Sequence, residues 1–158
     1  MIVTDYNKIE IVKNIIQDLL KAAEFEGKVE FEESIIKGLV FNISSPDSYL
    51  LIGRQGSTLH ALQILIQATV AKKLQSQEPF WFTIDVDDYK RKREWFLKET
   101  AKAAVEQVKK TGRPVRLEAM PNYERRFVHA YLHEHFPEVE SESMGEDPYR
   151  KIVIKPKR

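Results

Sequence analysis

Hydrophobic residues in the first part of the chain are spaced first as in a helix and then as in strands, and turn-forming residues separate these segments. Between residues 5 and 25 they recur every three or four positions, which predicts an amphipathic helix. Residues 29–32 alternate between apolar and polar side chains, and residues 39–43 are largely apolar, so both segments predict strands. The helix face that we expect to be buried carries Tyr6, Ile9, Val12, Ile16, Leu19 and Ala23.

A helical segment interrupted by glycines follows. Residues 49–52 predict one or two helical turns, Gly53 and Gly56 interrupt them, and Ser57 opens a helix that runs to about Gln75. Residues 80–86 predict a strand. The elements therefore follow the order α-β-β-α-α-β. We expect the long helix to bury Leu59, Leu62, Ile66, Val70 and Leu74, and the strand to bury Phe80, Phe82, Ile84 and Val86.

A second long helix is predicted from about residue 89 to 110. Asp87 or Asp88 can cap its start, and Gly112 followed by Pro114 gives its stop signal. Because one α+β unit is complete before this helix, we place a domain boundary near Asp87. We expect an α+β fold with two units, residues 1–87 and 88–158, joined by the long helix.

The remaining segments predict a small second unit. Residues 115–120 predict a strand, and a helix follows from about 122 to 135 with Asn122 as a candidate N-cap. The polar residues 141–149 include Gly145 and Pro148 and predict a loop or hairpin tip. Residues 151–155 predict a last strand.

Composition narrows the class of protein. The sequence has no cysteine, which excludes disulfides and thiolate metal sites. No apolar run approaches the roughly 18 residues of a membrane helix, and the N-terminus lacks a signal-peptide pattern. We therefore expect a soluble, cytoplasmic protein without membrane insertion. Residues 1–47 carry five basic and nine acidic side chains, whereas the remainder is basic. This asymmetry can create a positive face for a polyanion, although solvated surface charge explains it equally well.

The sequence Gly-Arg-Gln-Gly at residues 53–56 is the first candidate binding motif. Two glycines allow a sharp turn and a close approach to a partner, and the helix that opens at Ser57 directs amide groups and a positive dipole end towards a phosphate. Arg54 can pair with a phosphate, and Gln55 can bond a phosphate or a base. A plain helix–turn–helix connection is the simpler alternative. The predicted nucleic-acid contacts here are Ile52, Gly53, Arg54, Gln55, Gly56 and Ser57.

The second candidate motif is the pair Arg125 and His129, with Arg126 beside it. Positions four apart share a helix face, so a guanidinium and an imidazole would form a compact cationic site for a phosphate. Such a pair alone is a weak signal, because most pairs of this kind are ordinary surface residues.

A basic run, residues 90–93, opens the long helix. It can act as a phosphate clamp between the two motifs, and a solvated face paired with Asp85, Asp87 and Asp88 is an equal alternative. From this run we predict that Lys90, Arg91 and Arg93 contact nucleic acid.

The motifs and their order resemble known families. The element order, with the sequence from Leu51 to Gln63, resembles a type II KH domain, and the block around Arg125 and His129 resembles the Arg-xxx-His (R-three-H) domain that binds single-stranded nucleic acid. Together they resemble the Jag (KhpB/EloR) family of bacterial RNA-binding proteins over about residues 5–155. The resemblance implies a regulator linked to cell elongation, division or sporulation. Many members carry a further N-terminal domain and linker that we do not expect here, so we carry over no role of that part.

Three functions stay open. The first is binding of single-stranded RNA, or of single-stranded DNA, without catalysis, metal or cofactor. The second is a protein-interaction scaffold that pairs with a KH-only partner or with itself. The third, ranked last, is a metal-dependent nuclease using Asp85, Asp87 and Asp88. His129 and His133 share helical spacing but lack the pattern of a zinc site. We expect Trp81 and Trp95 in the core, with Trp81 the better candidate for stacking on a base.

Overall fold

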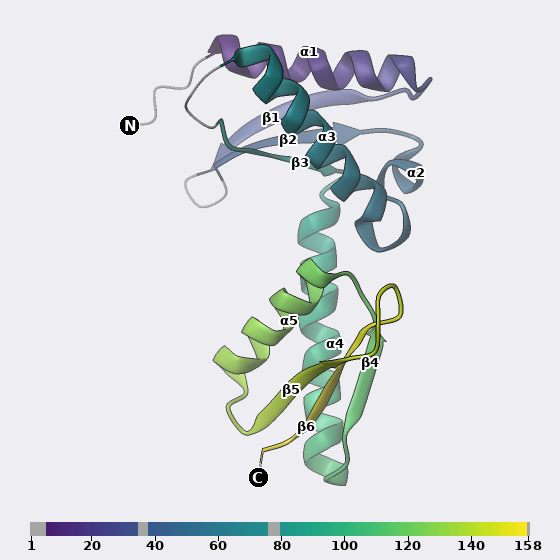
Figure 1. Cartoon of the computed structure of the whole chain (residues 1–158), viewed down its shortest axis with the longest axis vertical. Coiled ribbons are helices and arrows are strands. Elements are labelled where there is room, and N and C mark those ends of the chain that lie inside the picture. The colour runs from purple at the N-terminus through teal and green to yellow at the C-terminus, as the bar shows by residue number, and fades with distance from the viewer. Residues whose placement is uncertain (1–5, 35–37, 76–79, 158) are drawn as a thin grey trace. The chain divides into compact units, whose positions relative to one another are not determined.

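The chain divides into two compact units, the first ending at Lys90 and the second beginning at Arg91 (Figure 1). The computed structural model describes residues 6–34, 38–75 and 80–157. The first unit contains α1 (Tyr6–Ala22), β1 (Lys28–Ser34), β2 (Gly38–Ser44), α2 (Ser48–Ile52), the short 3-10 turn η1 (Arg54–Gly56), α3 (Ser57–Leu74) and β3 (Phe82–Val86). After it come α4 (Tyr89–Thr111), β4 (Val115–Ala119), α5 (Asn122–His135), β5 (Val139–Met144) and β6 (Lys151–Pro156).

The first unit is built on a three-stranded sheet in the order β1-β2-β3. Strands β1 and β2 are antiparallel, with Phe31 opposite Phe41, and β2 and β3 are parallel, with Phe41 opposite Ile84. Parallel strands cannot be joined by a tight turn, so the chain makes its crossover through α2 and α3. This crossover contains the Gly53–Gly56 loop.

The core of the first unit lies between this sheet and the helices α1 and α3. The Phe41 side chain is fully buried, and its ring meets the Phe82 ring edge-on at a centroid distance of 5.6 Å. Tyr6 is 73% exposed and Ala23 is also exposed, so the expectation that both are buried is wrong. The apolar face of α1 begins one turn after Tyr6, and the helix ends at Ala22. The buried side chains of the two helices are Ile9, Val12, Ile15, Ile16, Leu20, Leu59, Ile66 and Val70.

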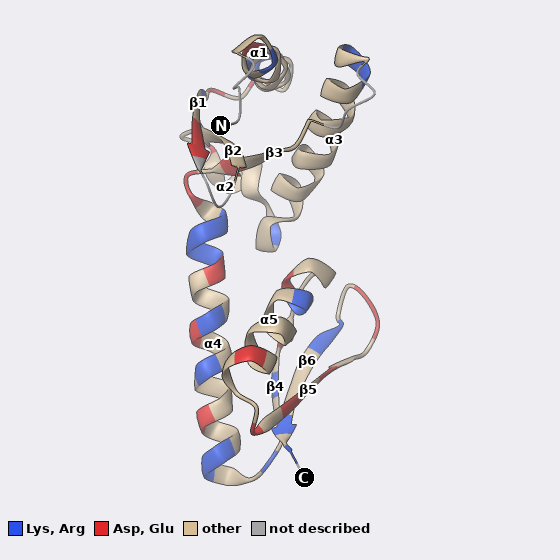
Figure 2. Ribbon diagram, turned by 90° about the vertical axis from the view of Figure 1, so that its left-hand side faces the viewer, with Lys and Arg blue, Asp and Glu red and all other residues tan. Residues whose placement is uncertain are grey.

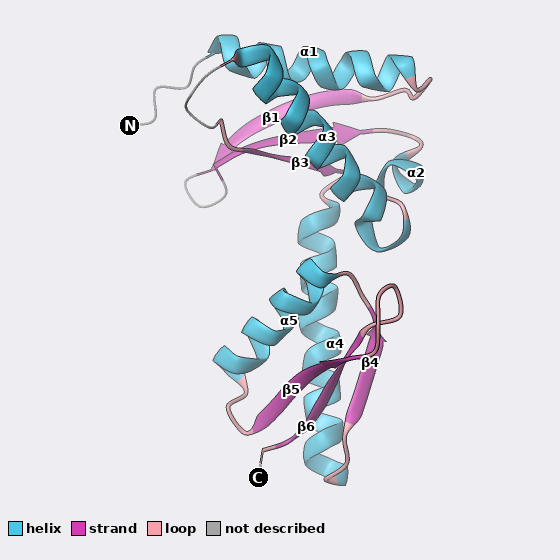
Figure 3. Ribbon diagram, in the orientation of Figure 1, coloured by secondary structure: helices cyan, strands magenta, loops and turns pink. Residues whose placement is uncertain are grey.

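The second unit packs α4 and α5 against an antiparallel sheet in the order β4-β6-β5 (Figure 3). The central strand β6 supplies Ile152 and Ile154, which are fully buried. The helix α4 ends where the Gly112 amide donates to the Val108 carbonyl, as the stop signal predicts. Charged residues occur along the 23 residues of α4 (Figure 2), and no helix in the described ranges is long and apolar enough to cross a membrane.

The α+β class and the α-β-β-α-α-β order of the first unit are confirmed, and two local expectations in the second unit are wrong. Residues 141–144, expected in a loop, belong to β5 and pair with β6. Asn122 is the first residue of α5, and Pro121 holds the N-cap position with an extended ψ of 158°. The boundary that we expected after residue 87 lies three residues before the division between the units.

Candidate nucleic-acid interface

The Gly53–Gly56 loop has a backbone that requires its glycines. Gly53 has a φ of +71°, and a Cβ atom placed there would lie 2.8 Å from the Thr58 Cβ and 2.9 Å from the Thr58 amide nitrogen. Gly56 has a φ of +77° and is the N-cap of α3. Glycine adopts these angles without the steric cost that other residues carry. The two glycines therefore bring the loop backbone close to the first turn of α3.

The polar side chains of this loop are accessible. Arg54 and Ser57 are exposed, Gln55 and Ile52 are half-buried, and Gly56 is buried beneath them. Gly56 offers no side chain to cap the first amides of α3. The structure thus brings the predicted contacts of the loop together at one helix start, and their binding of nucleic acid stays a prediction.

A side chain from α3 makes hydrogen bonds to the backbone of β3. The Gln63 Oε1 accepts a hydrogen bond of 2.6 Å from the Ile84 amide, and its Nε2 donates to the Phe82 carbonyl at 3.0 Å. Lys90 Nζ also donates to Gln63 Oε1 at 3.2 Å. Lys90, predicted to contact nucleic acid, thus also bonds a side chain of its own unit.

Asp85 joins β3 to the start of α4. Its carboxylate accepts hydrogen bonds from the amides of Val86 and Lys90. Asp85 lies on β3, so a strand residue supplies the acceptor for an amide in the first turn of α4. Burial raises the pKa of Asp85, and these amide bonds oppose the change. Within the described residues, no group of three or more His, Asp or Glu side chains could hold a metal ion.

Arg93, another predicted contact, forms a buried ion pair. Its Nε and Nη2 donate to the two carboxylate oxygens of Glu124 at 2.8 and 2.9 Å. The Glu124 side chain is 2% exposed and that of Arg93 is 20% exposed. A bidentate pair of this kind fixes α5 against α4 and satisfies a carboxylate that burial would otherwise penalise.

The other residues at the start of α4 lie on the surface. Arg91 and Lys92 are exposed, and so is Trp95, at 64%. Trp81 in the first unit is 75% exposed. The expectation that Trp95 belongs to the core is wrong, because the buried positions of α4 begin with Leu97. Trp81, which the sequence left as the better candidate for stacking, is exposed just before β3.

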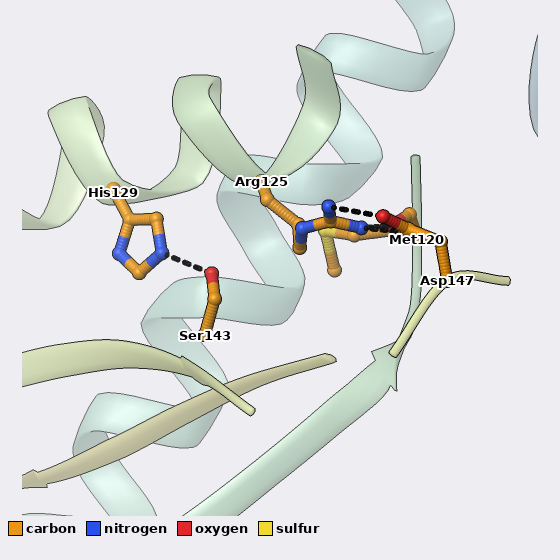
Figure 4. A network of polar contacts seen from close by, with 5 residues as sticks. All are labelled: Met120, Arg125, His129, Ser143 and Asp147. Carbon is orange, nitrogen blue, oxygen red and sulfur yellow. Dashed lines mark hydrogen bonds and ion pairs between the residues drawn. The ribbon is translucent and has the colours of Figure 1, made fainter. Parts of the chain in front are cut away.

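Arg125 lies in a polar network at the start of α5 (Figure 4). Its Nη1 donates to the Met120 carbonyl at 2.6 Å and to Asp147 Oδ1 at 2.7 Å, and its Nη2 donates to Asp147 Oδ2 at 3.2 Å. The Arg125 side chain is 5% exposed, whereas that of Asp147 is 63% exposed. The guanidinium beside Asp147 lowers the pKa of that carboxyl. A carboxylate from the β5–β6 connection thus occupies the anion position of Arg125.

His129 lies one helical turn beyond Arg125 and faces β5 (Figure 4). Its Nδ1 is 2.7 Å from Ser141 Oγ, and its Nε2 is 2.8 Å from Ser143 Oγ. Burial, and to a smaller extent the charge of Arg125, lower the pKa of His129 from its usual value. The imidazole is therefore neutral at neutral pH, with one nitrogen donating and the other accepting. Arg126, next to Arg125 in the sequence, is exposed. The binding of a phosphate by Arg125, Arg126 and His129 stays a prediction.

Both parts of the chain match known domains. Residues 9–78 match the KH domain of KhpA and KhpB, and residues 96–156 match the R-three-H domain. The chain is 31% identical to the RNA-binding protein KhpB of Bacillus subtilis over 158 residues, covering 99% of this chain and 74% of that protein. The chain belongs to the KhpB family. It is also 34% identical to the RNA-binding protein KhpB of Clostridium symbiosum over 150 residues, covering 95% of this chain and 65% of that protein.

Other KhpB relatives share a smaller part of their length with this chain. The KhpB protein of Lactiplantibacillus plantarum is 36% identical over 113 residues, which cover 72% of this chain and 34% of that protein. The two matched regions contain the Gly53–Gly56 loop and the Arg125–His129 pair. The basic run at residues 90–93 lies between them.

Several residues of the candidate site were not predicted from the sequence. Ser141, Ser143 and Asp147 fall in the segment expected to be a loop, and Glu124 carried no signal beyond its position beside Arg125. Residues 139–144 alternate between half-buried and exposed positions, as expected for a strand. The sequence did not reveal this strand, because its inward positions after Val139 are serines and not apolar residues.

Proposed function

We propose that this chain binds single-stranded RNA without catalysing a reaction, and that the Gly53–Gly56 loop is its main grip. The observation that carries this proposal is the open loop, with Arg54 and Ser57 exposed at a helix start whose N-cap has no side chain. Two relatives that match most of this chain are named RNA-binding proteins, which supports RNA binding by this chain. We also propose that the chain acts in the cytoplasm, as expected from the sequence.

The binding mode follows from the loop geometry. Phosphate oxygens accept from the first amides of α3, where the dipole favours an anion, and Arg54 adds an exposed positive charge. The half-buried Ile52 borders the same loop and offers an apolar surface to an adjacent base. Single-stranded RNA fits this arrangement better than a duplex, because its bases are unpaired and can turn towards the protein.

The second unit supplies a further phosphate contact. Arg126 is exposed, and Arg125 already holds one oxyanion in a bidentate geometry. A phosphate of the bound strand replaces the Asp147 carboxylate on Arg125, since both are anions with two accepting oxygens. Neutral His129 positions β5 beside this site through Ser141 and Ser143. Two linked sites strengthen binding through a high effective concentration, and the resulting regulator would act in cell elongation, division or sporulation.

A charge change in the loop tests the proposal. In the variant Arg54→Asp/Gln55→Asp, the new carboxylates repel phosphate, and aspartate tolerates the φ of +52° at position 55. We expect affinity for a fluorescent ten-nucleotide single-stranded RNA to fall about tenfold or more, as measured by anisotropy at low salt. The variant Lys72→Glu/Lys73→Gln carries the same change of charge at the other end of α3 and should retain binding. Equal affinity of the two variants would refute the loop as the grip.

A second candidate function, pairing with another copy of this chain, is favoured by the outer face of α3. Ile64 and Leu65 are 55% and 51% exposed, and Ala61 and Ala68 beside them are also exposed. An apolar helix face without covering side chains is typical of an interface between copies. The variant Ile64→Lys should convert a dimer to a monomer in light scattering. A monomeric wild-type chain, or capture of a KH-only protein by the same face, would contradict self-pairing.

A further inference from the structure

The first turns of α4 carry exposed aromatic and cationic side chains together. Trp95 is 64% exposed and Phe96 is 48% exposed, and Arg91 and Lys92 are exposed one turn earlier. Positions four apart lie on the same helix face, which pairs Arg91 with Trp95 and Lys92 with Phe96. These four residues line one open surface hollow. Figure 2 shows the concentration of Lys and Arg at this end of α4.

Packing of the second unit does not account for this surface. The positions of α4 that enter the core are Leu97, Ala101, Ala104, Val105 and Val108. Phe96 has a local role, because the Arg93 guanidinium lies 5.2 Å from its ring centroid while it holds Glu124. Trp95 points away from the core, so its large ring stays in contact with solvent. A tryptophan bordered by cations favours a partner that has both flat rings and negative charge.

We propose that Trp95 is a stacking platform for one base of the bound strand, with Arg91 and Lys92 contacting the adjacent phosphates. This inference rests on the proposed RNA binding and adds a contact at residues that lie in sequence between the two matched regions. Charge complementarity favours nucleic acid over a protein partner, since two exposed cations flank the ring. The Arg93–Glu124 pair ties this turn of α4 to α5, and the Arg93 guanidinium lies over the Phe96 ring.

Fluorescence of Trp95 tests the stacking directly. In the full chain carrying Trp81→Phe, Trp95 is the single tryptophan. A ten-nucleotide single-stranded RNA should quench its emission, and an abasic ribose-phosphate chain of the same length should not. In anisotropy measurements, Trp95→Ala should bind the RNA about tenfold more weakly, and Trp95→Phe should retain most of the affinity because its ring still stacks. Tyr6→Ala removes another exposed aromatic ring, on α1, and should leave affinity unchanged.

The outcomes separate this inference from the proposed function. RNA binding with unaltered Trp95 emission, or equal quenching by the abasic chain, overturns the stacking platform and leaves the loop intact. Trp95→Ala that binds RNA normally but loses a protein contact in light scattering also overturns it. Failure of the wild-type chain to bind any single-stranded RNA instead refutes the proposed function. The single-tryptophan measurement does not depend on whether Trp95→Ala folds.

Discussion

At the scale of single residues, Arg125 combines burial with an exposed anionic partner. Its side chain is 5% exposed, and its guanidinium is held by the Met120 carbonyl from the inside and by the Asp147 carboxylate from the outside. The inner bond orients the guanidinium, and the outer bond occupies the position that we assign to a phosphate. In the proposed binding mode, Asp147 competes with RNA for the same donors.

Removing this competitor should strengthen binding. In Asp147→Asn the side chain keeps its size but loses its charge, so we expect affinity for single-stranded RNA to rise roughly two- to tenfold at low salt. Anisotropy with the ten-nucleotide RNA measures the change. The neighbouring exposed substitution Glu146→Gln alters the net charge equally and should give a smaller gain. Weaker binding by Asp147→Asn would show that the pair only supports the β5–β6 connection.

His129 should make the stability of the second unit depend on pH. Its pKa in the folded chain is below the unfolded value near 6.5, because burial and Arg125 disfavour the imidazolium. Below about pH 6.5 the unfolded chain therefore binds more protons, and the free energy of unfolding falls as the pH falls towards the folded pKa. The contribution of neutral His129 is fully present above that range.

Urea unfolding at pH 7.5 and 5.5, followed by circular dichroism, measures this effect. The wild-type chain should lose more stability between the two pH values than His129→Gln, which cannot gain a proton. His133→Gln replaces an exposed histidine of the same helix and should behave like the wild-type chain. An identical pH dependence for wild type and His129→Gln would contradict this account of the imidazole.

At the scale of elements, the ion pair between Arg93 and Glu124 links α4 to α5. Because Glu124 is 2% exposed, its loss leaves Arg93 without its bidentate partner in a largely buried position. We expect Glu124→Gln to lower the free energy of unfolding by on the order of 3 kcal/mol. Urea unfolding at pH 7.5 checks this value.

The matched control is an exposed ion pair of the same helix. Glu99 accepts from Lys102 at 2.7 Å, and both side chains are close to half exposed. Glu99→Gln should cost less than about 1 kcal/mol, because water screens such pairs. If Glu124→Gln costs no more than Glu99→Gln, burial of the pair does not stabilise the junction of α4 and α5.

Element prediction from the sequence succeeded where burial alone determines the pattern. The faces of α1 and α3 and the strand β3 follow apolar spacing, so Ile9, Ile66 and Ile84 were placed correctly. Strand β5 was not predicted, because its inward-facing Ser141 and Ser143 are polar. They bond the His129 imidazole, and a pattern of apolar residues does not reveal such positions. The motif residues Arg125 and His129 were found, but the carboxylate and hydroxyls that hold them come from a segment distant in sequence.

At the scale of the whole molecule, we propose that one strand of RNA makes three contacts with the chain. In this proposal the loop at residues 53–56 grips the backbone, Trp95 stacks on a base, and Arg125 with Arg126 contacts a further phosphate. The sequence indicated the first and third contacts through motifs. It did not indicate the second, because exposure of Trp95 depends on which face of α4 enters the core.

Mapping of amide chemical shifts during titration tests the central claim most directly. The ¹⁵N-labelled chain would be titrated with the ten-nucleotide single-stranded RNA at low salt, and each backbone amide followed. We predict that the largest shifts occur at residues 53–58, where the loop meets α3, and that they disappear in Arg54→Asp/Gln55→Asp. RNA binding that leaves residues 53–58 unshifted, with changes confined to other surfaces, would contradict the account.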